Sequence, residues 1–268
     1  MLFSIITINY NNREGLLKTI KSVLEQSFDD YEYIIIDGGS TDGSIDILKE
    51  YAIHLDYWVS ERDRGIYHAM NKGVGYAQGE YCVFMNSGDS FYSKEVLKQV
   101  AAMGFEDDII VGDVVSTKDG KVIPTRPARE LSLYHLYSVS IPHQASFIRT
   151  SLLHKYPYDD NLKIASDWKF FLQTIILDNC SFRYIDVIVA EYDYNGISTQ
   201  NVEALRLEKN QILDSLFPQR ILLDYKWMKS TECKTQLLTS QLRNRYQIDR
   251  LLFRLGSFLL KVERWHFY

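Results

Sequence analysis

The sequence predicts an α/β protein with a mainly parallel sheet flanked by helices, followed by a helical C-terminal extension. Strand-like and helix-like segments alternate over residues 1–113, which is the pattern of βα units. The strand-like segments are short and almost continuously apolar, as is typical of strands buried on both faces. From about Val202 onward the pattern is helical.

The first 113 residues contain the alternating elements. Strands are expected at Phe3–Ile8, Tyr31–Ile36, Tyr57–Ser60, Tyr81–Met85 and around Ile109–Val111. Helices, with apolar residues at helical spacing, are expected at Arg13–Gln26, Ser44–Tyr51 and Ile66–Ala77.

The pattern changes after Asp113. A hairpin turn is expected at Lys118–Lys121, and further elements at Leu131–Tyr137 (helix), Ala145–Ile148 (strand), Ser166–Leu177 (helix) and Phe182–Tyr194 (strand). We therefore expect one domain over residues 1–200, with parts 1–113 and 114–200, and a helical extension over residues 201–268.

Composition excludes several classes of protein. The chain has 268 residues and 46% hydrophobic content, enough for a globular core. Its net charge of −5 argues against a nucleic-acid partner. The three cysteines match no metal spacing and suit a reducing cytoplasm. The sequence shows neither a signal peptide nor an apolar run of about 18 residues, so a cytoplasmic location is expected.

The turn DGGSTDGS, residues 37–44, lies between a predicted strand and a predicted helix. Open α/β sheets bind ligands at the carboxyl ends of their strands, so its carboxylate, glycines and hydroxyls suit a polar ligand. They equally suit capping of the helix by Ser40 or Thr41. A calcium loop is excluded, because the twelfth loop position is Leu48 rather than Glu.

Two further acidic positions are candidates for chemistry. Asn86-Ser87-Gly88-Asp89 follows the fourth strand, where it suits either a divalent cation or an Asx turn. Ser166 is a good N-cap that would put Asp167 in the first helical turn. There the helix dipole favours the ionised carboxylate that a general base requires, although acids in first turns also serve stability alone.

Taken together, these segments resemble the family-2 glycosyltransferases, inverting enzymes with the GT-A fold. The resemblance covers about the first 200 residues and is carried by SIITINYNN (4–12), IIIDGGSTDGS (34–44), SERDRGIYHAMNKGVGYAQGEYCVFMNSGD (60–89), HQASFIR (143–149) and IASDWKFFL (164–172). The chain looks most similar to bacterial members that build exopolysaccharide, capsule or O-antigen units. That resemblance implies transfer from a nucleoside-diphosphate sugar, with UDP expected first, to a glycan or a polyprenyl-diphosphate-linked acceptor.

The resemblance also implies roles for individual residues. Asp167 would be the catalytic base, and Asp89 would hold Mn²⁺ or Mg²⁺ against the diphosphate. Asp37 would accept a hydrogen bond from the base of the donor. The other expected donor-binding residues are Thr7, Asn9, Tyr10, Gly39, Ser40, Asp63, Asn71, Lys72, Ser87, Gly88 and His143.

Two departures from the family pattern bear on these roles. Gly38 stands where the family often has a second aspartate, and the metal motif retains only the carboxylate of Asp89. Asn86 or His143 is a candidate to assist the metal; His143 equally suits the donor diphosphate or a structural role. The alternative function is a non-catalytic homologue that binds a nucleotide sugar or a glycan.

The C-terminal segment has its own character. Residues 241–268 carry six Lys or Arg against two acids, interspersed with apolar and aromatic residues. Such a segment suits an anionic membrane surface, here the cytoplasmic face of the inner membrane. It equally suits packing on the domain or a dimer contact.

Overall fold

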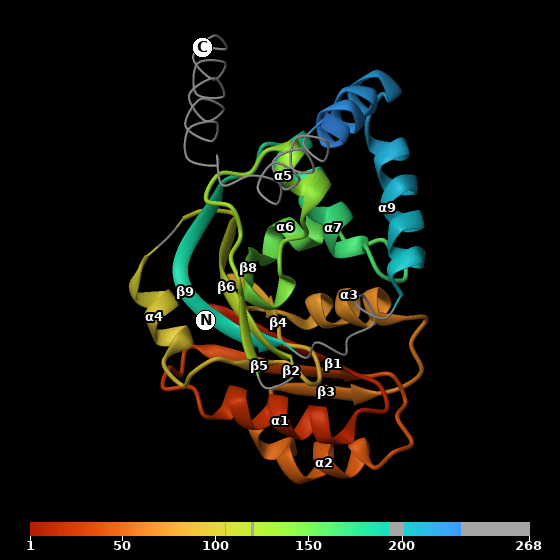
Figure 1. Cartoon of the computed structure of the whole chain (residues 1–268). Coiled ribbons are helices and arrows are strands. Elements are labelled where there is room, and N and C mark those ends of the chain that lie inside the picture. The colour runs from red at the N-terminus through yellow and green to blue at the C-terminus, as the bar shows by residue number, and fades with distance from the viewer. Residues whose placement is uncertain (105, 119–120, 193–200, 232–268) are drawn as a thin grey trace, which may run out of the picture. The chain divides into compact units, whose positions relative to one another are not determined.

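The computed structural model describes the chain except for residues 105, 119–120, 193–200 and 232–268 (Figure 1). The chain divides into two compact units, Met1–Leu216 and Phe217–Tyr268. The first unit contains the sheet and the helix α9 (Val202–Leu216). In the second unit, the described residues form a helix over 219–231.

The first unit is built around one sheet, in which the described residues form nine strands. The order is β3-β2-β1-β4-β8-β6-β9-β5, and β7 pairs with β6 beside this path. The strands are β1 (Phe3–Asn9), β2 (Tyr31–Asp37), β3 (Tyr57–Ser60), β4 (Tyr81–Phe84), β5 (Ser90–Phe91), β6 (Ile109–Lys118), β7 (Lys121–Thr125), β8 (Ser146–Arg149) and β9 (Phe182–Tyr192).

The two halves of the sheet differ in direction. The strands β1, β2, β3 and β4 pair in parallel, as the alternating pattern predicts. The strand β8 then pairs antiparallel with both β4 and β6, and the predicted hairpin is the antiparallel pair β6–β7. The strands β6 and β9 are parallel to each other again, so the sheet as a whole is mixed.

Helices cover both faces of this sheet. In Figure 1, α1 and α2 lie on one face of the parallel strands and α3 lies on the other. The helices of the first unit, besides α9, are α1 (Arg13–Leu24), α2 (Ser44–Tyr51), α3 (Ile66–Tyr76), α4 (Val96–Ala102), α5 (Leu133–Ser138), α6 (Thr150–Lys155) and α7 (Ser166–Phe171). Short turns occur at η1 (Ala52–His54) and η2 (His143–Ala145). The single helix predicted for 166–177 is α7 followed by a π-helical segment, η3 (Leu172–Leu177).

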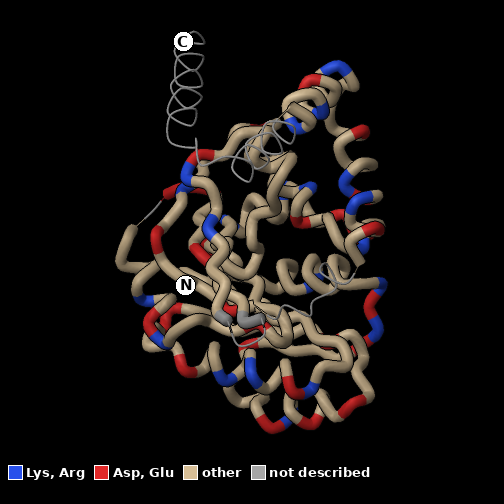
Figure 2. The backbone as a smooth tube through the Cα atoms, in the orientation of Figure 1, with Lys and Arg blue, Asp and Glu red and all other residues tan. Residues whose placement is uncertain are grey.

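The core lies between the sheet and its helices. Every residue of β1 and of β4 is buried, as expected for strands covered on both faces. Charged residues of both signs intermix on α1, α2 and α9 (Figure 2), where helices meet solvent. The helix α3 approaches β1 closely, because a Cβ at Gly73 would lie only 2.5 Å from Cγ2 of Ile6.

No helix in the described part of the chain is long and apolar enough to cross a membrane. Residues 241–268, for which the sequence predicts a membrane or dimer contact, lie outside the described residues, as does Cys233.

Candidate active site

Three polar segments meet at the carboxyl edge of the parallel strands. The register of β1 and β2 places Asn9 beside Asp37. The backbone N–H of Ser87 donates to the carbonyl of Ile8 at 3.0 Å, so the Asn86–Asp89 turn lies beside the end of β1. Backbone pairing therefore assembles the carboxyl edge of the strands, where the sequence predicts a polar ligand.

Asp37 holds the turn that follows β2. Its carboxylate is fully buried and accepts five hydrogen bonds, from Asn9, Gly39, Ser60 and twice from Ser40, at 2.5–3.2 Å. Two carboxylate oxygens offer about four acceptor positions, so this group is saturated within the protein. In this structure Asp37 fixes the turn after β2, and its contact with a donor base stays a prediction.

Ser40 and Gly39 belong to the same network. The hydroxyl of Ser40 accepts from the backbone N–H of Asn11 at 2.8 Å. Gly39 has a φ of +80°, a conformation that favours glycine. The prediction that Ser40 or Thr41 caps α2 is wrong: the N-cap is Gly43, which has no capping side chain. The hydroxyl of Ser40 instead donates a hydrogen bond to the carboxylate of Asp37.

The polar side chains of β1 lie beneath this edge. The hydroxyl of Thr7 is buried and bonds the carbonyl of Met85 at 2.7 Å and the Tyr33 hydroxyl at 3.0 Å. Asn9 is 1% exposed, and its Oδ1 finds no partner among the described residues. Both residues therefore support the edge from below.

Tyr10 presents an open aromatic ring at the edge. It is 67% exposed, and a Cβ at Gly38 would lie 3.1 Å from its Cδ2. A second aspartate at position 38 would therefore press on this ring. An exposed ring held over a glycine suits stacking with a nucleobase.

Asp63 and Lys72 form a charged cluster on the α3 side of the edge. Lys72 Nζ lies 2.5 Å from Asp63 Oδ1 and 2.8 Å from Glu61, and His68 Nδ1 lies 2.9 Å from Asp63 Oδ1. The other oxygen of Asp63 is buried and finds no partner in the described part of the chain. This carboxylate keeps one oxygen available to a hydroxyl or amide donor.

The side chain of Asn71 bonds to the backbone of Tyr158. Its Nδ2 donates to the carbonyl of Tyr158 at 2.7 Å, and its Oδ1 accepts from the N–H of the same residue at 2.9 Å. Asn71 thus ties α3 to the segment that leads toward α7. Both ends of the Asn71 amide are used in these two part-buried hydrogen bonds, and a contact with the donor stays a prediction.

Asp167 lies in the first turn of α7, as predicted, although the N-cap is Ala165 rather than Ser166. Its Oδ1 accepts from the Tyr67 hydroxyl at 3.0 Å, and its Oδ2 lies 3.3 Å from Nδ1 of His143. Nε2 of His143 in turn lies 3.2 Å from Nδ2 of Asn86. A chain of side chains thus links the predicted base to the predicted metal motif.

This linkage defines the part of the site that the sequence does not reveal. Both ring nitrogens of His143 are engaged in this structure, Nδ1 with Asp167 and Nε2 with Asn86, and its role beside a metal or the donor diphosphate stays a prediction. Tyr67 lies 100 positions from Asp167 in the chain, and no local pattern signals their contact.

Electrostatics keep Asp167 ionised. Burial opposes this, but the His143 hydrogen bond and charge, the Trp168 backbone N–H and the Tyr67 hydroxyl together lower the pKa of Asp167. Burial also opposes the charged imidazole, yet Asp167 and Asp89 raise the pKa of His143. Burial, with the neighbouring Asp167, raises the pKa of Tyr67 well above its ordinary value, so that the phenol remains a donor.

The Asn86–Asp89 turn offers a partial donor set for a cation. Asp89 is 7% exposed, and Oδ1 of Asn86 is buried with no hydrogen bond to any described residue. No group of three or more His, Cys, Asp or Glu gathers around a metal position within the described residues. A carboxylate and an amide oxygen still fit Mg²⁺ or Mn²⁺, because such ions take substrate phosphates and water as further ligands.

Ser87 and Gly88 are held by α1. Their carbonyls accept from Nδ2 of Asn12 at 3.0 Å and from Nζ of Lys18 at 3.1 Å. Gly88 has a φ of +107°, which favours glycine. After the turn, β5 pairs with β9, so both ends of this loop are fixed.

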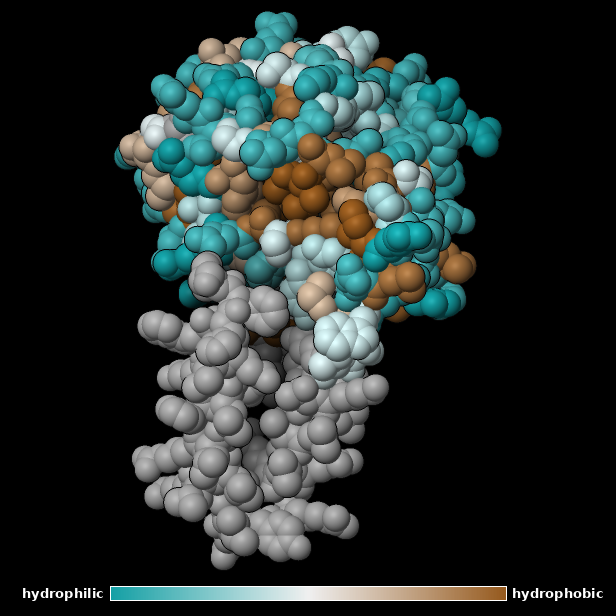
Figure 3. All heavy atoms as spheres, turned by 90° about the horizontal axis from the view of Figure 1, so that it is seen from above, coloured by the Kyte–Doolittle hydropathy of each residue, from teal (hydrophilic) through white to brown (hydrophobic). Residues whose placement is uncertain are grey.

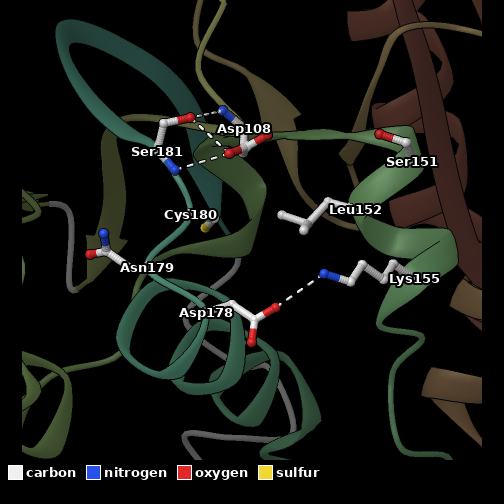
Figure 4. A pocket seen from close by; sticks show the side chains of 8 residues that line it. All are labelled: Asp108, Ser151, Leu152, Lys155, Asp178, Asn179, Cys180 and Ser181. Atoms are coloured by element: carbon white, nitrogen blue, oxygen red, sulfur yellow. Dashed lines mark hydrogen bonds and ion pairs between the residues drawn. The ribbon is translucent and has the colours of Figure 1, made fainter.

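A separate hollow lies at the opposite edge of the sheet (Figure 4). Its position follows from Asp108, a residue of its lining, whose carbonyl accepts from the backbone N–H of Arg149. Arg149 in turn pairs with Tyr81, at the amino end of β4. Two of the charged side chains that line the hollow form an ion pair, in which Lys155 Nζ lies 3.2 Å from Asp178. The lining residues are Asp108, Ser151, Leu152, Lys155, Asp178, Asn179, Cys180 and Ser181. None of them is a predicted site residue.

Solved structures share this fold. Staphylococcus aureus TarS 1–349 has a TM-score of 0.62 at 24% identity, covering 80% of this chain and 69% of TarS. The mannosyltransferase PcManGT of Pyrobaculum calidifontis has a TM-score of 0.56 at 16% identity, covering 96% of this chain and 84% of that one. The fold of this chain is thus the GT-A fold.

The sequence comparisons give the family. The model of Glycosyl transferase family 2 matches residues 4–158, and the chain belongs to this family. A PGL/p-HBAD biosynthesis glycosyltransferase of Mycobacterium bovis is 32% identical over 210 residues, covering 75% of this chain and 81% of the relative. The putative teichuronic acid biosynthesis glycosyltransferase TuaG of Bacillus subtilis is 40% identical over 107 residues, covering 38% of this chain and 42% of TuaG.

Proposed function

We propose that this glycosyltransferase inverts the anomeric centre as it moves a sugar from a nucleoside-diphosphate sugar to a glycan or a polyprenyl-diphosphate-linked acceptor in bacterial surface polysaccharide synthesis. The observation that carries the proposal is Asp167. Its carboxylate is kept ionised by its neighbours and is joined through His143 to the Asn86–Asp89 turn. Base and leaving-group site are thereby held in one network.

The reaction follows from this arrangement. Asp167 takes the proton of the acceptor hydroxyl as that oxygen forms a bond to the anomeric carbon. The bond from the anomeric carbon to the diphosphate oxygen breaks on the opposite face, so configuration inverts in one displacement. Tyr67 and His143 fix the direction of the Asp167 carboxylate throughout.

At the other end of the network, Asp89 and Oδ1 of Asn86 would hold Mn²⁺ or Mg²⁺. The cation would neutralise charge on the leaving diphosphate. Asn86 leaves its oxygen unpaired within the described residues, which supports this assignment.

The donor and acceptor classes rest on similar proteins. TarS has been solved with UDP and with UDP-GlcNAc, and PcManGT with GDP-Man and Mn²⁺. We therefore expect a UDP-sugar first and a GDP-sugar second. The names of the relatives refer to PGL/p-HBAD and teichuronic acid biosynthesis, which supports a cell-surface glycan as the product class.

A donor panel tests the proposal. The purified chain is mixed with UDP-, GDP- and dTDP-sugars in Mn²⁺, Mg²⁺ or EDTA, and thermal shift and nucleoside-diphosphate release are measured. Stabilisation and release with one donor, both lost in EDTA, are expected. Stabilisation without release, persisting when lipid-linked acceptors are added, would favour the non-catalytic binding homologue. No response to any donor would contradict the assignment of the pocket.

A further inference from the structure

The segment just before α7, residues 163–165, donates three consecutive backbone N–H groups to the side chain of Glu208. Glu208 accepts from Lys163 through Oε1 at 2.7 Å. Its Oε2 accepts from Ile164 at 2.9 Å and from Ala165 at 3.0 Å. Glu208 belongs to α9, which lies beyond the residues 4–158 that the family model matches.

A second contact from α9 reaches the other side of Asp167. Nζ of Lys209 lies 4.7 Å from the centre of the Trp168 ring and donates to Ser140 at 2.9 Å. Trp168 is 1% exposed and donates its Nε1 to the carbonyl of Leu136 at 2.7 Å. Two neighbouring residues of α9 therefore contact the chain on either side of Asp167. Glu208 bonds residues 163–165, and Lys209 lies over the ring of Trp168.

The start of α7 depends on this external support. Its N-cap, Ala165, has no side chain that can cap, and Oγ of Ser166 is buried without a partner among the described residues. A carboxylate that accepts three backbone N–H groups forms charge-assisted hydrogen bonds, which are stronger than neutral ones. Glu208 thus holds the residues before α7 in place of a capping side chain, which the local sequence of α7 lacks.

We propose that Glu208 is a positioning residue for Asp167. It fixes residues 163–165, and hence the rotation and start of α7, so that the carboxylate of Asp167 points at the acceptor hydroxyl. This inference rests on the proposed role of Asp167 as base. Misplacement of a reacting group by about 1 Å can cost about a hundredfold in rate, so a support of this kind acts on turnover.

The test is the substitution Glu208→Gln in the full-length enzyme. The amide keeps the size of the side chain but turns an N–H₂ group toward a backbone donor. We expect kcat for transfer to fall about tenfold, while the KM for the nucleotide sugar stays within about twofold. A merely structural role would lower the melting temperature without this split between kcat and KM.

Glu203→Gln is the matched control, because Glu203 lies on the same helix and is exposed. Its carboxylate bonds Arg206 one turn further along α9, at 2.6 and 3.0 Å. We expect wild-type kcat and KM for this variant. A loss equal to that of Glu208→Gln would overturn the inference.

A double-mutant cycle shows whether Glu208 acts through Asp167. Asp167→Asn with Glu208→Gln should have the same residual rate as Asp167→Asn alone, within about twofold. A further tenfold loss in the double variant, or a wild-type kcat in Glu208→Gln, would overturn the inference. If Glu208→Gln does not fold, Glu208→Asp replaces it, with the same expected fall in kcat and the same criterion.

The two proposals fail in different ways. A wild-type rate in Asp167→Asn would remove the base, and with it both the proposed mechanism and this inference. A strong loss in Asp167→Asn together with a wild-type rate in Glu208→Gln would leave the mechanism standing and overturn the inference alone.

Discussion

At the scale of single residues, Asp167 combines burial with ionisation, which normally oppose one another. Asp167→Asn keeps the shape of the side chain but removes its capacity to accept a proton. We expect kcat to fall by about 10²- to 10⁴-fold, with donor affinity unchanged within about threefold. Sugar transfer and donor thermal shift measure the two quantities. Asp186→Asn, on an exposed position of β9, is the control and should retain full activity.

The pH dependence of the rate should depend on Tyr67. The hydrogen bond from its hydroxyl helps to lower the pKa of Asp167, so Tyr67→Phe raises that pKa. Because the base works only when ionised, the acid limb of kcat should move to higher pH. At pH values well above the pKa of Asp167 in either enzyme, kcat of the wild type and of Tyr67→Phe should differ by less than about threefold.

Kinetics between pH 4 and 9 would measure this shift, with Tyr81→Phe as control. The Tyr81 hydroxyl donates to the carbonyl of Asp107, on the side of the sheet away from the site. An unmoved acid limb in Tyr67→Phe would contradict the role given to this hydroxyl.

Local sequence predicts where these residues stand but not what they contact. Asp37 ends a strand, Asp89 follows one, and Asp167 lies in the first turn of a helix, close to where the sequence predicts them. The capping roles predicted for Ser40 and Ser166 are wrong, because partners or burial from distant segments override local propensity. The contacts of Asp167 with Tyr67 and His143 arise only when α3, η2 and α7 pack together.

At the scale of elements, the contact of α3 with β1 depends on Gly73. In Gly73→Ala the new methyl group would meet Ile6 at 2.5 Å, so strand and helix must separate. Overpacking of this kind costs about 1–3 kcal/mol of unfolding free energy. Urea unfolding measures the loss.

Gly75→Ala in the same helix is the matched control. A Cβ there meets no atom within 4 Å. Alanine has the higher helix propensity, so we expect stabilisation by about 0.5–1 kcal/mol. Equal effects of the two substitutions would contradict the packing of α3 on β1.

The predictable elements are the long, strongly patterned ones. All strands expected in the first 113 residues are present, and so are α1, α2 and α3. The sequence pattern does not predict β5, α4 or α6, which have two, seven and six residues. Such short elements carry too few residues for a periodic pattern and are defined by their pairing and packing.

At the scale of the whole molecule, apolar side chains gather on one area of the surface seen from above (Figure 3). Exposed apolar areas of this kind mark contact sites with partners or membranes. The sequence adds the excess of basic residues in 241–268. The basic residues of this segment support the proposal that the enzyme contacts an anionic membrane.

Neutralising the basic segment tests this proposal in the full-length chain. Replacement of Arg243, Arg245, Arg250 and Arg254 by Gln should weaken sedimentation with vesicles that contain anionic lipid, because each charge near such a surface contributes about 1 kcal/mol. Wild-type binding should itself decline with salt. The control variant replaces four exposed lysines elsewhere, namely Lys21, Lys49, Lys94 and Lys98. Equal vesicle binding by both variants would end the membrane proposal.

The pairing of β5 with β9 has a consequence for the order of events during synthesis. Ser90, directly after Asp89, pairs with Glu191, so the loop in the first third of the chain is held by the last strand of the sheet. A nascent chain that has not yet released residue 191 carries the Asn86–Asp89 turn without the β5–β9 pairing that follows it. Contacts between such distant positions slow folding, and this pair closes late. The growing polypeptide can therefore fix the end of the Asn86–Asp89 turn only after residue 191 has left the ribosome.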